Sequence, residues 1–327
     1  MRKKLREVRF LLLLFPWVFL TIGCSYLVKN EKRLVYSKPK YGQDKFAVVQ
    51  NYNIHYVETG EGQPVLLIPG SFSTYRNWNR MVPLFPKDYK LLAIDYLGVG
   101  DSDKPPSGFH YTIEEQADLI AQMIEQLGIS NVHIVGVSYG GAIALNLAAR
   151  YPDKVGKIVC VEGAVIKPKK VPFNSMRGFL KWPLIGDLSV GVIRSGLFDK
   201  SVTKLLMGKA WDTMDSDEKR ESIEIVAQNN KTASRVSWYH ISRTIKTSKD
   251  FAEEAKTIRA PVLYFYSQNS DFRDMAERNV DFLKTHLPNV EIVYFKDGIH
   301  DLELQKPQEV TDLILNFLSK GRTNVQN

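Results

Sequence analysis

Cysteine is scarce in this chain, which has only Cys24 and Cys160 among its 327 residues. Two cysteines cannot form the framework of a small disulfide-stabilised secreted fold. Closely spaced metal-binding cysteines and histidines, a dinucleotide-binding fingerprint and a phosphate-binding loop are also missing from the sequence. We therefore expect no metal and no cofactor, and we expect a chain of this length to be stabilised by its hydrophobic core.

An excess of charge is missing from most of the chain. The formal net charge of +8 arises within residues 1–40, which hold ten Lys and Arg residues and two Glu residues. The rest of the chain carries 34 basic and 34 acidic side chains. A neutral body lacks the basic surface that nucleic acids require, so we expect no nucleic-acid partner.

The basic N-terminus continues into an apolar run from Leu11 to Gly23, and Cys24 follows directly. This order is typical of a signal segment, and residues 20–24 resemble a bacterial lipobox with Cys24 as the lipidated residue. A second interpretation is an uncleaved transmembrane anchor, because residues 10–28 are mostly apolar and long enough to cross a bilayer core of about 30 Å. Residues 1–28 are thus predicted to attach an exported lipoprotein, or an anchored protein, to a membrane. Residues 29–44 would form a spacer.

Beyond the spacer, short β-branched runs alternate with helical patterns. Such alternation predicts an α/β fold with a mostly parallel sheet and helices on both of its faces. One interval between strands, residues 164–259, is far longer than an ordinary connection. We interpret it as a helical cap inserted into a core of residues 45–163 and 260–320. The expected strands cover residues 46–50, 53–58, 65–69, 90–95, 132–137, 157–162, 261–267 and 290–295.

Ser138 lies in the sequence Gly136-Val137-Ser138-Tyr139-Gly140, between a β-branched run and an alanine-rich segment. A serine on a very tight strand-to-helix turn has a strained backbone, and its hydroxyl projects beyond the sheet. Such a turn closes only when side chains are absent two residues before and after the serine. Gly136 and Gly140 meet that requirement, so the pattern predicts that Ser138 is a catalytic nucleophile.

Two further motifs resemble loops of the α/β-hydrolase family. Residues 94–105 read IDYLGVGDSDKP, similar to the family's D-x-x-G-x-G-x-S-x-x-P loop, and residues 297–304 read DGIHDLEL, similar to its histidine loop. With the serine motif between them, they indicate the epoxide-hydrolase-like and esterase-like branch with a helical lid. The resemblance implies that His300 is the general base. It also implies an oxyanion hole next to Gly70, built from the backbone N–H group of Tyr139 and that of Ser71 or Phe72.

The acid that would pair with His300 has two candidates. The family's usual acid follows the strand at 261–267, where Ser270 occupies the expected position and Asp271 comes one residue later. Some branches instead use an acid after the strand that follows the nucleophile helix, and Glu162 ends that strand here. A carboxylate that ends an otherwise apolar strand is hard to explain by packing. We favour Asp271, with Glu162 as the alternative.

These residues predict a serine hydrolase that cleaves a small or lipid-like carboxylic ester or thioester through an acyl-enzyme. Epoxide hydrolases and haloalkane dehalogenases carry an aspartate where this chain has Ser138, and a serine favours acyl chemistry. The alternatives are a C–C bond hydrolase or a cofactor-free haloperoxidase with the same three residues, and a non-catalytic binding protein on this fold. The presence of both Ser138 and His300 argues against a binding protein, which has no need of them.

Overall fold

The computed structural model describes residues 38–163, 165–166, 174–247 and 251–320, and within them the chain forms an eight-stranded β-sheet. The strands are β1 Gln43–Val49, β2 Tyr52–Thr59, β3 Gln63–Ile68, β4 Tyr89–Ile94, β5 Val132–Val137, β6 Val155–Val161, β7 Val262–Ser267 and β8 Val290–Phe295. Their spatial order is β1-β2-β4-β3-β5-β6-β7-β8. β2 pairs antiparallel with β1 and with β4, and all other neighbours pair parallel. The prediction of a mostly parallel α/β sheet is confirmed.

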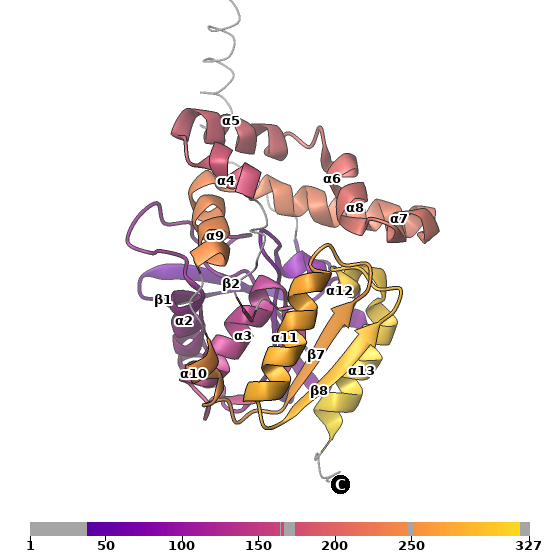
Figure 1. Ribbon diagram of the computed structural model, residues 1–327. Coiled ribbons are helices and arrows are strands. Elements are labelled where there is room, and N and C mark those ends of the chain that lie inside the picture. The colour runs from indigo at the N-terminus through magenta and orange to yellow at the C-terminus, as the bar shows by residue number, and fades with distance from the viewer. Residues whose placement is uncertain (1–37, 164, 167–173, 248–250, 321–327) are drawn as a thin grey trace, which may run out of the picture.

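Helices cover both faces of this sheet, as expected (Figure 1). The elements of this layer are η2 Tyr75–Trp78, η3 Val82–Leu84, α2 Ile113–Gln126, α3 Tyr139–Arg150, α10 Ala252–Ala255, α11 Arg273–His286, α12 Leu302–Gln305 and α13 Pro307–Ser319. Residues of α2, α3 and α11 pack on one face, and residues of η2, α12 and α13 pack on the other. The central strands β3 to β7 are therefore mostly buried on both sides, which is typical of a parallel sheet.

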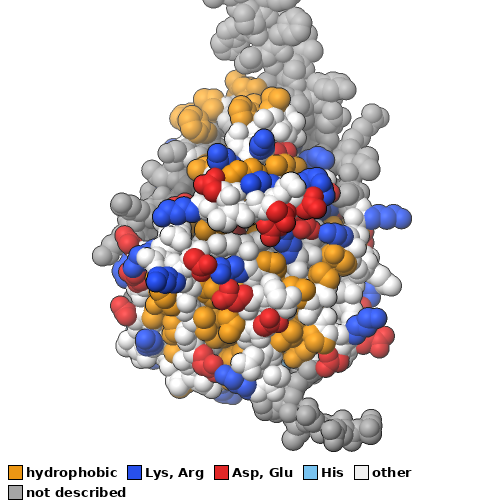
Figure 2. Space-filling view, turned by 90° about the vertical axis from the view of Figure 1, so that its right-hand side faces the viewer, with side chains coloured by type: hydrophobic (Ala, Val, Ile, Leu, Met, Phe, Trp, Pro, Cys, Tyr) orange, Lys and Arg blue, Asp and Glu red, His pale blue; other side chains and the backbone are white. Residues whose placement is uncertain are grey.

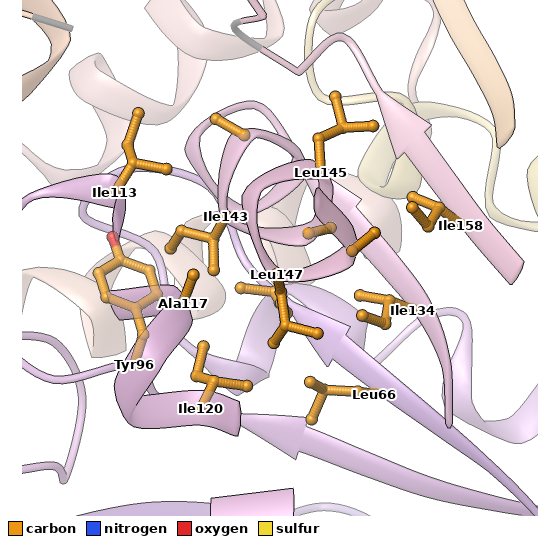
Figure 3. Packing of buried hydrophobic residues seen from close by; sticks show 14 of the residues in the cluster. Leu66, Tyr96, Ile113, Ala117, Ile120, Ile134, Ile143, Leu145, Leu147 and Ile158 are labelled. Atoms are coloured by element: carbon orange, nitrogen blue, oxygen red, sulfur yellow. The ribbon is translucent and has the colours of Figure 1, made fainter. Parts of the chain in front are cut away.

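The two faces follow from the alternation of side chains along each strand. Leu66 and Ile68 of β3 join one apolar cluster, while Val65 and Leu67 of the same strand join the other. Figure 3 shows part of the first cluster, in which residues of α2 and α3 lie over the sheet. Each large aliphatic side chain buried in this way contributes about 1.5–3 kcal/mol to folding. The core thus holds rigid the loops that leave the carboxyl ends of the strands.

A further group of helices lies between β6 and β7, within the interval expected to form a cap. We call them the cap helices: α4 Asn174–Leu180, α5 Pro183–Arg194, α6 Asp199–Met207, α7 Ala210–Thr213, α8 Ser216–Lys231 and α9 Arg235–Thr247. They lie together at one end of the molecule (Figure 1). Asn229 of α8 donates to Asn77 of η2 at 2.9 Å, and η2 follows the carboxyl end of β3. The cap helices therefore lie over the sheet edge at which ligands bind in α/β folds.

The segment predicted to reach a membrane, including Cys24, lies outside the described residues. In the part of the chain that is described, no helix combines the length and the apolar character needed to cross a bilayer. The described chain begins beside the cap, because Nζ of Lys40 lies 2.8 Å from Oε1 of Glu221 in α8.

Candidate active site

Ser138 follows β5 and immediately precedes α3. Its φ of 51° and ψ of −112° lie outside the helical and strand regions, so the backbone is strained at this residue. The turn is crowded, because a Cβ on Gly136 would meet the carbonyl of Gly140, and a Cβ on Gly140 would meet the carbonyl of Ile68. Glycine at both positions lets the turn close. Ser138 is consequently placed, half-buried, at the carboxyl edge of the sheet.

The turn after β3 runs beside Ser138. A Cβ on Gly70 would lie 3.6 Å from the Cβ of Ser138, an ordinary van der Waals distance, so the two segments are in direct contact. The Tyr96 hydroxyl fixes this turn, because it donates to the Gly70 carbonyl at 3.1 Å and accepts from the Phe72 N–H at 3.2 Å. The Phe72 N–H is therefore engaged, whereas the Ser71 N–H donates to no other described residue. Of the two candidate donors in this turn, Ser71 is the one that retains a free N–H.

Tyr139 is the first residue of α3, where backbone N–H groups have no acceptor within the helix. The partial positive charge at a helix N-terminus favours an anion at this point. The Tyr139 side chain is buried and its hydroxyl donates to the Tyr111 carbonyl at 3.0 Å, which holds the first turn of α3 in place. The N–H groups of Tyr139 and Ser71 can thus act as a pair of donors to an oxyanion formed at Ser138.

His300, in the loop after β8, contacts a buried carboxylate. Its Nδ1 lies 2.7 Å from Oε2 of Glu162, the residue that follows β6 and whose side chain has no exposed area. The same carboxylate oxygen accepts a hydrogen bond from the Ser270 hydroxyl at 2.5 Å. An ionised carboxylate can only accept, so Nδ1 of His300 carries a proton and Nε2 is the nitrogen that can take up another.

This contact favours Glu162 over the predicted Asp271 as the acid partner, because Glu162 is the carboxylate that contacts His300. Asp271 is exposed, one residue beyond Ser270 in the turn after β7. β6 and β7 are adjacent parallel strands, so the residues that follow them meet at the same edge of the sheet. In the turn after β7, Ser270 is the residue that reaches Glu162, and Asp271 faces solvent.

The surroundings of His300 favour its protonated form. Burial lowers the pKa of the imidazole, but the hydrogen bond and charge of Glu162, with the charges of Asp301 and Glu303, outweigh burial and raise this pKa to about 9. Burial, with the neighbouring charge of Asp301, raises the pKa of the Glu303 carboxyl to about 8. The imidazole must therefore lose a proton before it can act as a base.

We expect kcat/KM to rise with pH through about 9, because it follows the protonation of the free enzyme and only neutral His300 accepts a proton. In Glu162→Gln the partner that raises the pKa is gone while burial remains, so the midpoint should move to lower pH. Initial rates with an ester that does not itself titrate, measured from neutral to alkaline pH, check both expectations. An unchanged midpoint in Glu162→Gln would show that another group governs the profile.

A buried polar junction connects the histidine loop to the cap. Asn77 of η2 accepts from Asn229 of α8 at 2.9 Å and donates to Glu303 of α12 at 3.3 Å. Thr74 donates to the amide oxygen of Asn229 at 2.5 Å. The sequence carries no signal for these residues, because polar residues in short segments have the same pattern as surface positions. Their burial is a tertiary property, and Asn77 connects Glu303, three residues after His300, to Asn229 of the cap.

A second group of titratable side chains consists of His55, Asp95 and Asp101. The atoms through which they could bind a metal ion lie within 4.8 Å of one another. Asp95 is fully buried and accepts from the His55 ring at 2.8 Å, from the Asp101 N–H at 2.9 Å and from the Tyr75 N–H at 2.8 Å. These bonds join the loop after β4 to β2 and η2. The buried carboxylate of Asp95 thus supports the loop after β4.

The comparisons with known proteins agree with this geometry. A sequence profile of the family described as "alpha/beta hydrolase fold" matches residues 63–306. A cis-3-alkyl-4-alkyloxetan-2-one decarboxylase of Shewanella oneidensis is 29% identical over 42% of this chain and 44% of that protein. A 2-hydroxy-6-oxo-2,4-heptadienoate hydrolase of Pseudomonas putida is 34% identical over 35% of this chain and 41% of that protein. The chain therefore matches less than half the length of these two relatives.

The fold also resembles the crystal structure of a membrane phospholipase A. The TM-score is 0.66, with 22% sequence identity, and the match covers 99% of this chain and 100% of that chain. At this level of identity the likeness concerns the fold.

Proposed function

The chain belongs to the α/β-hydrolase family, and from that premise we propose that it is a serine hydrolase that cleaves a carboxylic ester through an acyl-enzyme. The proposal is carried by the 2.7 Å contact between Nδ1 of His300 and Oε2 of Glu162. This pair lies at the same sheet edge as the strained turn of Ser138. The three residues would serve as nucleophile, general base and orienting acid.

In the acylation step, Oγ of Ser138 attacks the acyl carbon of the ester while Nε2 of His300 takes the hydroxyl proton. Glu162 holds the ring through Nδ1 and stabilises the imidazolium that forms. The oxyanion accepts hydrogen bonds from the N–H groups of Tyr139 and Ser71, and each such donor accelerates the reaction by about 10²–10³. The C–O bond then breaks, and the leaving alcohol receives the proton from His300.

The deacylation step repeats this sequence with water. Nε2 of His300 takes a proton from a water molecule, whose oxygen attacks the acyl carbon of acyl-Ser138. The second tetrahedral intermediate collapses, the bond to Oγ of Ser138 breaks, and His300 returns the proton to that oxygen. The products are a carboxylic acid and an alcohol, and the enzyme is restored.

A C–C bond hydrolase is the second candidate. It is favoured by the 34% identity to the Pseudomonas putida hydrolase over 35% of this chain. The compound in that protein's name carries a ketone and no ester, so its hydrolysis breaks a carbon–carbon bond beside a carbonyl. For such a substrate His300 would have to deliver a proton to carbon instead of oxygen. A membrane phospholipase A shares this fold, so lipid-like esters belong among the substrates to be tested for the leading candidate.

A substrate panel separates these candidates. We expect turnover of esters of graded acyl length, and covalent labelling of Ser138 by a fluorophosphonate, located by peptide mass spectrometry. Turnover of the dienoic keto acid without turnover of any ester would favour the second candidate. A protein that is neither labelled nor active on either class would be a binding protein on this fold.

We also propose that the N-terminal segment attaches the enzyme to a membrane as a lipoprotein modified at Cys24. The basic start, the apolar run and the cysteine support this assignment. Cys24→Ser should then block processing and leave a precursor that retains residues 1–23. Mass spectrometry of the mature wild-type protein provides the check. A chain that begins at Met1 and carries no lipid would favour the uncleaved anchor instead.

A further inference from the structure

The outer side of the cap exposes large apolar side chains. Of the twelve large hydrophobic residues that are exposed in the described chain, nine lie between residues 179 and 206, in and between α4, α5 and α6. Figure 2 shows hydrophobic side chains gathered at the cap end of the molecule. We call the nine residues the cap patch: Phe179, Trp182, Leu184, Ile185, Val192, Leu197, Phe198, Leu205 and Leu206.

The side chains of the cap patch in α5 lie on the side of the helix that faces away from the protein core. Helix α5 buries Gly186 and Val190 on one side and packs on α8 and α9, while Leu184 and Val192 face outward. Helix α5 is also the element of the cap that lies farthest from the sheet (Figure 1). The most exposed member, Leu197, has 78% of its surface accessible. Contiguous apolar exposure of this kind marks a surface that contacts another apolar phase or partner.

The charged side chains along the segment that bears the cap patch are mostly positive. Four exposed lysines lie along the same segment: Lys181, Lys200, Lys204 and Lys209. The two acids of α4–α6 are engaged within the protein, since Asp187 pairs with Arg235 at 2.8 Å and Asp199 accepts from Asn230 at 2.7 Å. The body of the chain is neutral, so this excess is local. Apolar side chains bordered by lysines are typical of surfaces that lie in the interface of an anionic bilayer.

Two further observations favour a bilayer over a protein partner. Trp182 is 60% exposed within the patch, and Nζ of Lys181 lies 5.8 Å from the centre of its ring. Tryptophan is enriched at the boundary between lipid headgroups and acyl chains, where a lysine can bury its stem and extend its ammonium group toward the headgroups. The described chain also begins beside the cap, at the Lys40–Glu221 ion pair, and an apolar N-terminal run precedes that point in the sequence.

We propose that the cap patch is a membrane-docking surface whose apolar side chains insert into a bilayer that contains anionic lipid. The four lysines contact the headgroups, and the cap faces the membrane with the sheet behind it. The N-terminal segment and the cap patch thus hold the body at the bilayer by two contacts at the same end. The docking surface is independent of the chemistry at Ser138.

The test uses the full chain with Cys24→Ser, reconstituted into vesicles of phosphatidylcholine and phosphatidylglycerol. Cys160 is fully buried, so one added cysteine can be labelled with a fluorophore. The reporter is Leu184→Cys in the cap patch, and the matched control is Asp153→Cys, whose side chain is 89% exposed before β6 at the opposite sheet edge. Spin-labelled lipid should quench the fluorophore at 184 and leave the fluorophore at 153 unquenched. Equal signals at the two positions would overturn the proposal.

The second part of the test removes apolar side chains from the cap patch. With the reporter at 184, Leu197→Ser and Leu205→Ser should each lower the ratio of docked to undocked cap by about tenfold. The matched control is Phe46→Ser with Val48→Ser, which are 55% and 56% exposed on β1 and should leave the ratio unchanged. Melting temperature, together with turnover of a short water-soluble ester, shows that each variant is folded. Loss of docking with turnover intact is therefore distinct from a failure of the proposed function.

Lipid composition and self-association complete the test. Replacing phosphatidylglycerol by phosphatidylcholine should lower the docked ratio by about fivefold for each lysine at the surface. An equal ratio in neutral vesicles would overturn the requirement for anionic lipid. If lipid does not quench the fluorophore at 184, and the protein in detergent is a dimer that dissociates in Leu197→Ser with Leu205→Ser, the patch joins two copies of the chain. The membrane proposal would then be wrong.

Discussion

Ser138→Ala should lower kcat by about 10⁶, to the background provided by binding and the oxyanion hole. No acyl-enzyme can form without the hydroxyl, and fluorophosphonate labelling should disappear with activity. The fold should be unaffected, because alanine keeps the Cβ at a φ of 51° that Ser138 already adopts. The Ser138 hydroxyl also forms no hydrogen bond with another described residue, so its removal leaves no partner unsatisfied. Steady-state kinetics and a melting curve provide the measurement.

Ser71→Ala is the matched control for this variant. The same change of side chain occurs in the turn beside the nucleophile, but Ser71 would act through its backbone N–H, which alanine retains. We expect kcat of Ser71→Ala within a few-fold of the wild type. Ester hydrolysis by Ser138→Ala above a few per cent of wild type would show that Ser138 is not the nucleophile.

Glu162→Gln should lower kcat by up to about 10⁴. A glutamine can no longer hold the His300 ring with an ionised acceptor at Nδ1, and it does not stabilise the imidazolium. The substitution preserves the shape of the side chain and removes a buried charge. Oε1 of Glu162 has no hydrogen-bond partner in the described chain. The melting temperature at neutral pH should fall, because His300 loses the partner that stabilises its protonated form. A melting transition that stays above the assay temperature separates a catalytic loss from unfolding.

Asp271→Asn is the control for the acid, because it makes the same kind of change on an exposed side chain. Its kcat should stay close to the wild-type value. An inactive Asp271→Asn together with an active Glu162→Gln would show that Asp271 is the acid that pairs with His300. Ser270→Ala should fall between these results, since it removes one hydrogen bond to Glu162 and leaves the contact with His300.

The serine turn could be read from its own residues, whereas His300 was predicted through the resemblance of residues 297–304 to the family's histidine loop. A Cβ on Gly136 would meet the carbonyl of Gly140 within the serine motif itself. A Cβ on Gly140 would meet the carbonyl of Ile68, a contact that the order of neighbouring residues does not show. The alternation of strands and helices likewise predicted all eight strands and a mostly parallel sheet. The helical character of the long interval after β6 was also accessible from its pattern.

The acid could not be chosen from the sequence, because two turns end at the same sheet edge. Which turn directs a side chain at His300 depends on how β6 and β7 lie side by side, and a count of residues does not contain that geometry. The apolar strand before Glu162 did carry a signal, since a carboxylate there has to be buried. The junction of Asn77, Asn229 and Glu303 was inaccessible for the same reason, because its members come from distant parts of the chain.

Because Glu162 raises the pKa of His300, a rise in pH should change stability and turnover in opposite directions. The pKa of His300 in the folded chain, about 9, is higher than the 6.5 of an ordinary histidine, so the folded state binds this proton more tightly than the unfolded state. The resulting stabilisation is complete below pH 6.5 and is lost as the pH rises through about 9. Turnover by the neutral imidazole increases over the same interval. We therefore expect the protein to unfold less readily near neutral pH, and to turn over faster but unfold more readily at alkaline pH.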